Sequence, residues 1–476
     1  MAADIDAIRA AVSGDSARKA GVQHNPTLPA DYPPFMIANR TIPFELETRH
    51  MLMVGTPGSG KTQAIKQQLE IARLREAPAA LLDHGGEMMQ YFYRDGIDIN
   101  LNPMDERCVG WTPFNELKRI SDFKRVAKLL VPDSGGQNQD WTEGAQQVVS
   151  DTLRSLWNLG ANFRKNEPLL YFLLKAPLHG IDNAESLEWL LRSTSSRRLF
   201  EVGNEKQLAI TMGIISRHME PLTYLREGDF SITDFVKSFE KKGVCRRWLF
   251  LSYTDDNYAA IGPLMAMWME FVVQAGLLLS ESALRRFYLV CDELGSLRAM
   301  KALYDALTKW RKFGGVVIAG LQSTAQIEDP DKYGEKGAQS LLSCFGTVLM
   351  LRVGDDQTAE KLSRILGDRK LQKESRSVSE GSSGWSDSTT TKEEVERLVL
   401  ASNFGVLPDR TGYLRVAGMK GVYRMGMDAT GAADPESMIP VSALPKISPK
   451  EITRKDVSLE WLDEQAAQLE MEVLPA

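Results

Sequence analysis

The chain has 476 residues, of which 43% are hydrophobic and 25% are charged, with a formal net charge of −6. This composition is typical of a soluble globular protein, and the length predicts two or three domains. The negative net charge excludes a nucleic-acid-binding surface that covers the whole protein, so any such surface must be a local basic patch. The four cysteines and five histidines lack metal-ligand spacing, and the cysteines are expected to be reduced thiols.

The N-terminal residues 1–34 are expected to lie at the periphery of the fold. A short amphipathic piece, residues 5–12, precedes a proline-bearing stretch that ends at Pro34. Residues 1–14 have neither the basic start nor the unbroken apolar run of a signal peptide, so no such leader is predicted. Residues 35–46 alternate enough between apolar and polar side chains to suggest strands that flank a nucleotide site.

A phosphate-binding loop follows an apolar run at 51–54, which is expected to be a strand. The loop has the pattern G-x-x-x-x-G-K-T, and a helix-compatible stretch, residues 63–74, follows it. This strand–loop–helix setting turns backbone N–H groups toward a polyphosphate, so we expect a bound nucleoside triphosphate. Lys61 would reach the β- and γ-phosphates, and Thr62 would be a ligand of Mg²⁺. The loop comprises Gly55, Thr56, Pro57, Gly58, Ser59, Gly60, Lys61 and Thr62.

The order of elements predicts an α/β fold with a mostly parallel central sheet. Strands alternate with helix-compatible stretches, and right-handed crossovers between such strands give a parallel sheet. From about residue 116 to residue 235 this rhythm stops, and apolar residues recur at helical spacing, which predicts an all-α insertion of roughly 120 residues. Strands after the phosphate loop are expected at 79–82, 99–101, 248–252, 287–290, 316–319, 347–351, 413–416 and 422–425.

The predicted domain boundaries follow from this interruption. A discontinuous nucleotide-binding domain comprises residues 35–116 and 236–440, and the all-α domain comprises residues 117–235. Residues 441–476 are expected to form an acidic tail or helix, because residues 458–472 are acidic and amphipathic.

Two segments call for separate interpretation. Residues 261–279 are apolar enough to imitate a membrane span, but Glu270 lies within them and is costly in lipid. A helix buried inside an α/β core is therefore expected there. Residues 373–392 are rich in Ser, Thr and Gly, and they are expected to form a mobile loop.

An apolar run that ends in two acids supplies the second nucleotide motif. Residues 287–290 are apolar, and Cys291, Asp292 and Glu293 follow. Nucleotide-binding sheets hold their ligands at the carboxyl ends of parallel strands, so Asp292 would hold Mg²⁺ and Glu293 would polarise the attacking water. The alternative is a strand followed by an acidic helix cap. The second acid favours hydrolysis over binding alone.

A third strand, residues 316–319, leads to Gln322, Ser323 and Thr324. Gln322 could hydrogen-bond the γ-phosphate or the lytic water. Equally, Ser323 and Thr324 could begin a helix while Gln322 has no role. The basic cluster at 309–312 precedes this strand, and it could be a solvated helix end. In a ring of subunits, a cation of this cluster could instead reach a neighbour's γ-phosphate as an arginine finger.

Longer motifs accompany the two nucleotide motifs. They are LNPMDER (101–107), GWTPFNE (110–116), DELGSL (292–297), DALTKWRKFGG (305–315), AGLQST (319–324) and LPDRTGYL (407–414). Together with the helical insertion, their order resembles the type IV secretion coupling proteins of bacterial conjugation, the TraD/TrwB family. The resemblance runs from about residue 49 to residue 427, and it is more specific than the phosphate loop, which many NTPases share.

The resemblance implies a RecA-like P-loop ATPase with an all-α domain, assembled as a homohexamer on the cytoplasmic side of the bacterial inner membrane. It implies ATP and Mg²⁺ as ligands and DNA as cargo, mainly single-stranded and bound without sequence preference. It also implies the relaxase–DNA complex and the secretion channel as partners. Carried over by position, Arg311 resembles the arginine finger, Gln322 the γ-phosphate sensor, and Arg49 a basic residue near the nucleotide. The residues of the two nucleotide motifs keep the roles given above.

One departure from the family pattern leaves alternatives open. Members of the family usually begin with two membrane-spanning helices, and none is predicted in this sequence. Either the N-terminal membrane-spanning part has been removed, or the chain is a naturally soluble member that docks on a membrane partner. A duplex-DNA translocase of the same RecA-like superfamily is a second hypothesis, although the helical insertion argues against it. A third is a docking hub for secretion substrates whose assembly is regulated by nucleotide.

Overall fold

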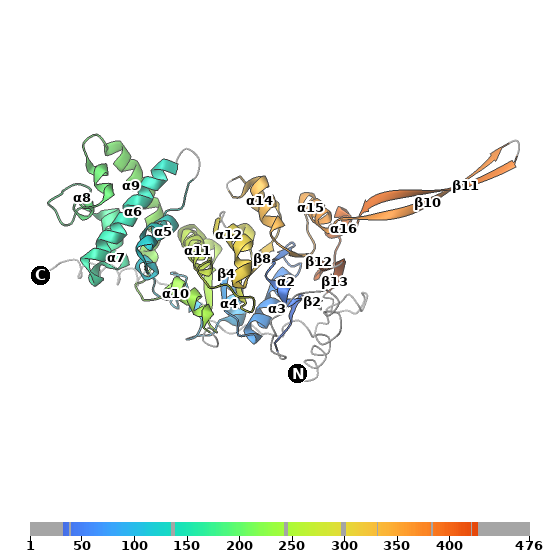
Figure 1. Cartoon of the computed structure of the whole chain (residues 1–476), viewed down its shortest axis with the longest axis horizontal. Coiled ribbons are helices and arrows are strands. Elements are labelled where there is room, and N and C mark those ends of the chain that lie inside the picture. Colours follow the sequence, from blue (N-terminus) through green and yellow to red (C-terminus); the bar gives the residue numbers. More distant parts are fainter. Residues whose placement is uncertain are drawn as a thin grey trace. The chain divides into compact units, whose positions relative to one another are not determined.

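The computed structural model describes residues 32–37, 40–134, 139–241, 246–296, 301–330, 332–381, 384–419 and 421–426 (Figure 1). The predictions for residues 1–31 and 427–476, including the C-terminal amphipathic stretch, lie outside these residues. The described residues fall into two compact units, which are treated separately. Unit 1 comprises the described parts of Met1–Arg75, Cys291–Ala299 and Val316–Lys446, and unit 2 those of Glu76–Val290 and Met300–Gly315.

Unit 1 is built on strands in the order β13-β12-β9-β3-β8. β3 (Met51–Val54) is parallel to both of its neighbours, β8 (Gly315–Leu321) and β9 (Thr347–Met350). All three strands are buried at every position, which explains why their sequences are continuous apolar runs. β12 (Thr411–Val416) pairs antiparallel with β9 and with β13 (Val422–Gly426) at the edge.

The other elements of unit 1 are helices and two small antiparallel sheets. β1 pairs with β2 just before the α2 turn, so the expected strands at 35–46 are present only in the first part of that range. The elements are β1 (Phe35–Ile37), β2 (Arg40–Ile42), α2 (Phe44–Glu47), α3 (Lys61–Leu74), η8 (Leu294–Ser296), α13 (Ala325–Glu328), α14 (Gly334–Ser343), α15 (Asp356–Leu366), β10 (Asp368–Gly381), β11 (Gly384–Arg397) and α16 (Ala401–Gly405).

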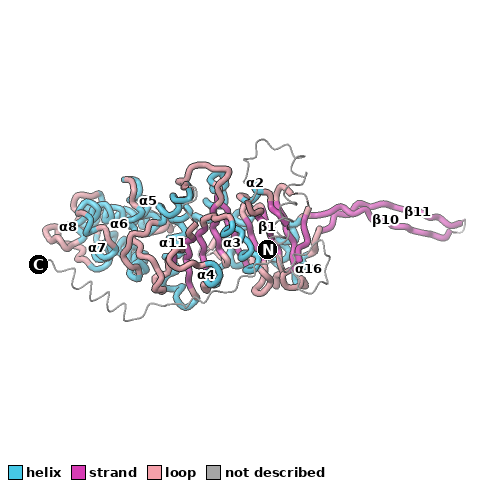
Figure 2. Tube along the Cα trace, turned by 90° about the horizontal axis from the view of Figure 1, so that it is seen from below, coloured by secondary structure: helices cyan, strands magenta, loops and turns pink. Residues whose placement is uncertain are grey.

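The expectation of a mobile loop at 373–392 is wrong. β10 and β11 form a long antiparallel hairpin, paired from Asp368 with Arg397 to Gly381 with Gly384 (Figure 2). The expectation rested on Ser, Thr and Gly content alone. Threonine favours strands, and a hairpin pairs the backbone groups of a polar segment without a buried face.

Unit 2 contains strands in the order β7-β4-β6-β5. β6 (Trp248–Tyr253) is parallel to β4 (Ala79–His84) and to β5 (Ile99–Asn100), and β7 (Phe287–Cys291) lies beyond β4. Each strand predicted after the phosphate loop is found in one of the two units, with bounds within two residues of those expected. The α/β prediction with a mostly parallel sheet is therefore confirmed.

Helix α11 (Asp255–Gly276) is the apolar segment that could imitate a membrane span. Among the described helices it alone is long and apolar enough to cross a bilayer, and 67% of its most apolar window is buried inside the protein. Its Glu270 carboxylate accepts a hydrogen bond from the Ala302 backbone N–H (3.0 Å) at the start of α12 (Lys301–Lys309). The short helices α4 (Glu87–Phe92) and η9 (Trp310–Phe313) also belong to this unit.

The segment predicted as an all-α insertion is helical in unit 2, and its described part between 113 and 240 contains no named strand. The helical spacing of apolar residues predicts one face on α6 (Gln139–Leu159), and five of its seven residues are buried, whereas Trp141 and Trp157 are half-buried. The buried five, each at most 1% exposed, are Ala145, Val148, Val149, Leu153 and Leu156. The domain boundaries at 117 and 235 remain a prediction. The elements are η1 (Pro113–Glu116), α5 (Ile120–Leu130), α6 (Gln139–Leu159), η3 (Ala161–Phe163), α7 (Asn166–Leu170), η4 (Tyr171–Lys175), α8 (Leu187–Leu191), η5 (Ser195–Phe200), α9 (Glu205–Met219), η6 (Glu220–Tyr224), α10 (Ile232–Lys237) and η7 (Ser238–Glu240).

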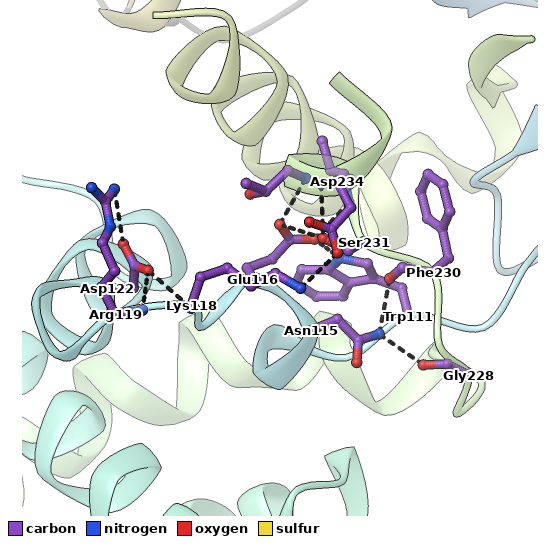
Figure 3. A network of polar contacts seen from close by, with 12 residues as sticks. Trp111, Asn115, Glu116, Lys118, Arg119, Asp122, Gly228, Phe230, Ser231 and Asp234 are labelled. Carbon is purple, nitrogen blue, oxygen red and sulfur yellow. Dashed lines mark hydrogen bonds and ion pairs between the residues drawn. The ribbon is translucent and has the colours of Figure 1, made fainter. Parts of the chain in front are cut away.

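The chain segments that enter and leave this helical region are joined by a buried polar network (Figure 3). The Asn115 side-chain amide donates to the carbonyls of Gly228 and Phe230, both at 2.8 Å. The two backbones also meet at Gly110, where an added Cβ would lie 1.9 Å from the Glu227 carbonyl oxygen. Only glycine permits so close a crossing.

Glu116 lies at the centre of this network and is 0% exposed. Its carboxylate accepts hydrogen bonds from the indole N–H of Trp111 (2.9 Å) and from the backbone N–H groups of Ile232 (2.7 Å) and Thr233 (2.9 Å). The Ser231 hydroxyl lies 3.3 Å from the same carboxylate. One buried acid therefore satisfies the N-terminal donors of α10 and fixes the entering segment to the leaving one.

Candidate nucleotide site

The phosphate loop connects β3 to α3 in unit 1, as the sequence predicts. β3 ends at Val54 and α3 begins at Lys61, so the loop lies at the carboxyl end of a buried parallel strand. Gly60 has φ +110°, a left-handed conformation that favours glycine. Gly55 has no room for a side chain, because an added Cβ would lie 2.4 Å from the Ser59 hydroxyl oxygen. Both glycines are therefore required by the backbone path of the loop.

Lys61 is held inside the loop by the loop itself. It is 7% exposed, and its ammonium group donates a hydrogen bond to the Gly55 carbonyl at 2.6 Å. Burial lowers the pKa of Lys61, and the nearby carboxylates of Glu293 and Asp292 oppose this shift. A polyphosphate here would stabilise the charged form of the lysine and would therefore oppose the effect of burial.

Thr62 and Asp292 face each other across a short gap. The Thr62 hydroxyl lies 3.4 Å from Oδ2 of Asp292. Oxygens that share one Mg²⁺ ion at about 2.1 Å in octahedral geometry lie about 3 Å apart, so this pair fits Mg²⁺. The described residues contain no group of three or more His, Cys, Asp or Glu side chains that could hold a metal ion. Phosphate oxygens and water would complete the coordination, as is usual for Mg²⁺ at nucleotide sites.

Glu293 and Gln322 are in direct contact. The Gln322 side-chain amide donates a hydrogen bond to Oε2 of Glu293 at 2.6 Å. The other carboxylate oxygen, Oε1, accepts from the Gly295 backbone N–H at 3.3 Å. Gln322 therefore contacts the candidate base, and its contact with a γ-phosphate or the lytic water stays a prediction. Ser323 accepts a hydrogen bond from the Ala325 N–H, whereas Thr324 makes no side-chain cap to α13.

A cavity of about 340 Å³ lies beside the loop in unit 1. Its volume lies within the range of about 300–1,000 Å³ that is typical of small-molecule sites. The Thr56 N–H donates to the Arg352 carbonyl at 2.8 Å and so joins the loop to the cavity wall. The lining residues are Thr56, Arg352, Val353, Gly354, Asp355, Asp356, Ala359, Ala401, Ser402 and Gly405.

Apart from Thr56, the residues that line this cavity are not among the predicted site residues. A signal for part of the wall is nevertheless present, because Arg352, Asp355 and Asp356 follow the predicted strand at 347–351. β9 is parallel to β3, so its carboxyl end lies at the same sheet edge as the loop. Residues 401–405 carry no comparable signal.

Two predicted site residues are not brought to the loop within unit 1. Arg49 precedes β3 and therefore lies at the opposite end of that strand from the loop, about 13 Å away at 3.3 Å per residue. Its guanidinium donates to the Ala417 carbonyl at 2.9 Å. Arg311 belongs to unit 2, lies on η9, and is exposed.

The chain has relatives of known kind. The family model described as "Type IV secretion-system coupling protein DNA-binding domain" matches residues 34–428. Coupling protein TraD of Escherichia coli (strain K12) is 30% identical over 383 residues, which are 78% of this chain and 51% of TraD. Protein VirD4 of Rhizobium rhizogenes is 24% identical over 281 residues, 55% of this chain and 39% of VirD4. The chain thus spans about half or less of the length of these relatives.

Solved structures agree with this assignment. The bacterial conjugative coupling protein TrwBdeltaN70 has a TM-score of 0.74 and 27% identity, with 89% of this chain and 91% of that chain covered. TrwB in complex with ADP and Mg²⁺ has a TM-score of 0.73 and 27% identity, with 89% and 92% covered. The predicted fold and the resemblance are therefore confirmed. The chain belongs to the family of type IV secretion-system coupling proteins.

Proposed function

We propose that this chain is an ATP-hydrolysing DNA motor that couples the relaxase–DNA complex to a type IV secretion channel and drives single-stranded DNA transfer. The observation that carries the proposal is the set of two polar pairs and one buried lysine that follow strand ends in unit 1. The Thr62 hydroxyl lies 3.4 Å from the Asp292 carboxylate, and the Gln322 amide lies 2.6 Å from the Glu293 carboxylate. Lys61 is buried, and the charges of both acids favour its protonated form. Two acids with separate partners suit metal binding and water activation.

The roles follow from these contacts. The loop N–H groups and Lys61 bind the β- and γ-phosphates, while Thr62 and Asp292 hold Mg²⁺, which would neutralise charge on the phosphates. Glu293 accepts a proton from the attacking water, and Gln322 senses the γ-phosphate. Solved TrwB complexes with ADP and Mg²⁺ and with the ATP analogue ADPNP support ATP and Mg²⁺ as ligands of this chain.

DNA as the cargo is supported by the name of the matching family model, and conjugation by the similarity to the bacterial conjugative coupling protein TrwBdeltaN70. We infer mainly electrostatic, sequence-tolerant binding of single strands, which weakens steeply with salt. We also infer that the motor acts on the cytoplasmic side of the bacterial inner membrane, as the resemblance to the family implies. In a homohexamer, the exposed Arg311 would act as an arginine finger on the neighbouring subunit's nucleotide.

The test measures ATP turnover of the purified chain without DNA, with single-stranded DNA and with duplex DNA. Lys61→Ala should reduce turnover to background while DNA affinity stays within about twofold of the wild type. Glu293→Gln should keep ATP binding and lose turnover by about 10²–10⁴-fold. Lys206→Ala, which changes an exposed lysine of the helical region, is the control and should have no effect.

A mixing experiment tests Arg311. Arg311→Ala and Lys61→Ala should each be inactive alone, and a mixture should recover part of the turnover, because some sites then combine an intact Lys61 with a neighbour's intact Arg311. An active Arg311→Ala, or a mixture that stays inactive, would refute action in trans. Stronger stimulation by duplex DNA would favour the translocase, and background turnover under every condition would favour the docking hub.

A further inference from the structure

A buried cluster of hydroxyl groups lies directly after Gln322 in unit 1. Ser323 and Thr324 follow Gln322 at the end of β8, and Thr358 lies in the first turn of α15. The Thr358 hydroxyl oxygen accepts a hydrogen bond from the Thr324 backbone N–H at 2.9 Å. It also lies 3.2 Å from the hydroxyls of both Ser323 and Thr324. Thr358 thereby ties helix α15 to the loop that carries Gln322.

Thr358 is also fixed from the side of the cavity. Its backbone N–H donates to the side chain of Asp355 at 2.7 Å, which caps α15. Asp355, Asp356 and Ala359 all line the cavity beside the phosphate loop. Thr358 itself is 0% exposed, so it lies behind the cavity wall rather than in it. Its hydroxyl therefore joins the cavity wall to the Gln322 loop.

We propose that Thr358 is a positioning residue for ATP hydrolysis, whose hydroxyl holds the 322–324 backbone so that the Gln322 amide meets Glu293. The inference rests on the proposed function and assigns a role to a residue that no nucleotide motif contains. Gln322 reaches Glu293 through three rotatable side-chain bonds, so its amide can turn between partners, and these partners stay within its reach only while its backbone is fixed. The Thr324 N–H to Thr358 bond supplies that fixed point.

With its backbone held by Thr358, Gln322 can exchange its partner between Glu293 and the γ-phosphate. While Gln322 donates to Oε2 of Glu293, one lone pair of that oxygen is engaged. A γ-phosphate competes for the same amide, and when Gln322 turns to the phosphate, this lone pair is released and can accept a hydrogen bond, and then a proton, from water. The exchange requires the loop backbone to stay in place while the side chain turns, and Thr358 keeps it there.

Three matched variants test this role in steady-state ATP hydrolysis. Thr358→Val removes the hydroxyl at nearly constant volume and should lower kcat by about 10- to 100-fold with KM within about twofold of wild type. Thr358→Ser keeps the hydroxyl and should restore kcat to within about threefold. Thr211→Val is the control, because Thr211 is 1% exposed and its hydroxyl has no partner among the described residues.

Two further measurements separate positioning from general damage. Thr358→Val in a Gln322→Ala background should cause no additional loss of kcat, because both changes act through one side chain. Hydrogen exchange of the peptide 321–326 should quicken by about tenfold in Thr358→Val and not in Thr358→Ser, because only valine removes the acceptor of the Thr324 N–H. This measurement needs no turnover.

The proposal is overturned if Thr358→Val keeps wild-type kcat, if serine is as impaired as valine, or if exchange at 321–326 is unchanged. A multiplied loss in the double variant also overturns it. A wild-type chain without turnover would instead refute the proposed function, and the exchange result would then decide on its own whether Thr358 holds the Gln322 loop.

Discussion

Replacing Glu116 with glutamine tests how the helical region is fixed in unit 2. The carboxylate accepts from the Trp111 indole N–H and the Ile232 N–H at Oε1, and from the Thr233 N–H at Oε2. Glutamine has the same shape but one acceptor oxygen, and its NH₂ group would face a donor. Glu116→Gln should therefore leave at least one buried N–H unsatisfied, at a cost of about 1–3 kcal/mol.

The loss of unfolding free energy should differ between the glutamine and alanine substitutions of Glu116. Glu116→Ala removes the acceptor of all three N–H groups, so we expect a cost of about 3–5 kcal/mol, at the upper end for a single substitution. With about 2–4 °C per kcal/mol for a unit of this size, Glu116→Gln should lower the thermal midpoint of unfolding by roughly 2–12 °C. Tryptophan fluorescence can follow the transition, because the chain has nine tryptophans, of which Trp111 is one.

A matched control lies on α10, the helix whose first N–H groups donate to Glu116. Asp234 forms an ion pair with Lys118 at 2.6 Å, but their side chains are 57% and 44% exposed. Asp234→Asn should change stability by no more than about 0.5 kcal/mol. The reasoning is refuted if Glu116→Gln unfolds at the wild-type midpoint, or if Asp234→Asn is destabilised as strongly. Hydrogen exchange at 232–233 should quicken in Glu116→Gln alone, since the Ile232 and Thr233 N–H groups bond to different carboxylate oxygens and glutamine keeps only one of them.

Three further predictions concern other buried groups. Glu47→Gln should destabilise unit 1 by about 3 kcal/mol in urea unfolding followed by circular dichroism, because Glu47 and Arg75 form a bidentate pair at 2.9 Å with side chains 1% exposed; a loss below about 1 kcal/mol would contradict this. Burial raises the pKa of the Cys291 thiol to about 12, so the native chain should be alkylated at pH 8 far more slowly at Cys291 than at the partly exposed Cys344; equal rates by mass spectrometry would disprove it. Because burial lowers the pKa of Lys61, the nucleotide-free folded chain binds the Lys61 proton less tightly than the unfolded chain does. The free energy of unfolding should therefore be lower than that of Lys61→Met, and this difference should shrink as pH rises from the lowered pKa to the ordinary value. A difference that widens with pH would contradict the assigned direction of the pKa shift.

The fold was predictable where one local pattern determined the outcome. The continuous apolar runs at β3 and β8 can be satisfied only by strands covered on both faces, and both are buried at every position. The hairpin β10–β11 was missed because its strands pair only with each other, so neither needs an apolar face. The length of the hairpin depends on the pairing of residues up to 29 positions apart, from Asp368 with Arg397 inward, and no short sequence pattern predicts that pairing.

The residues of the candidate site are likewise of two kinds. Some are positioned by the end of a strand, and others by hydrogen bonds to distant segments. Lys61, Asp292 and Gln322 are each placed by a strand end, and parallel strands bring such ends to one edge whatever the intervening sequence. Thr358 has no such marker, because its position depends on helix α15 packing its first turn against the loop after β8. In the sequence, a threonine three residues after an aspartate predicts only a helix N-terminus. Thr358 does have that position, because its N–H donates to the capping Asp355. Its second partner, the Thr324 N–H, is 34 residues away in the chain, and only the folded sheet brings the two together. Residues that make the chemistry possible can thus be found from motifs, whereas those that hold the chemistry in position must be found from hydrogen bonds between distant segments.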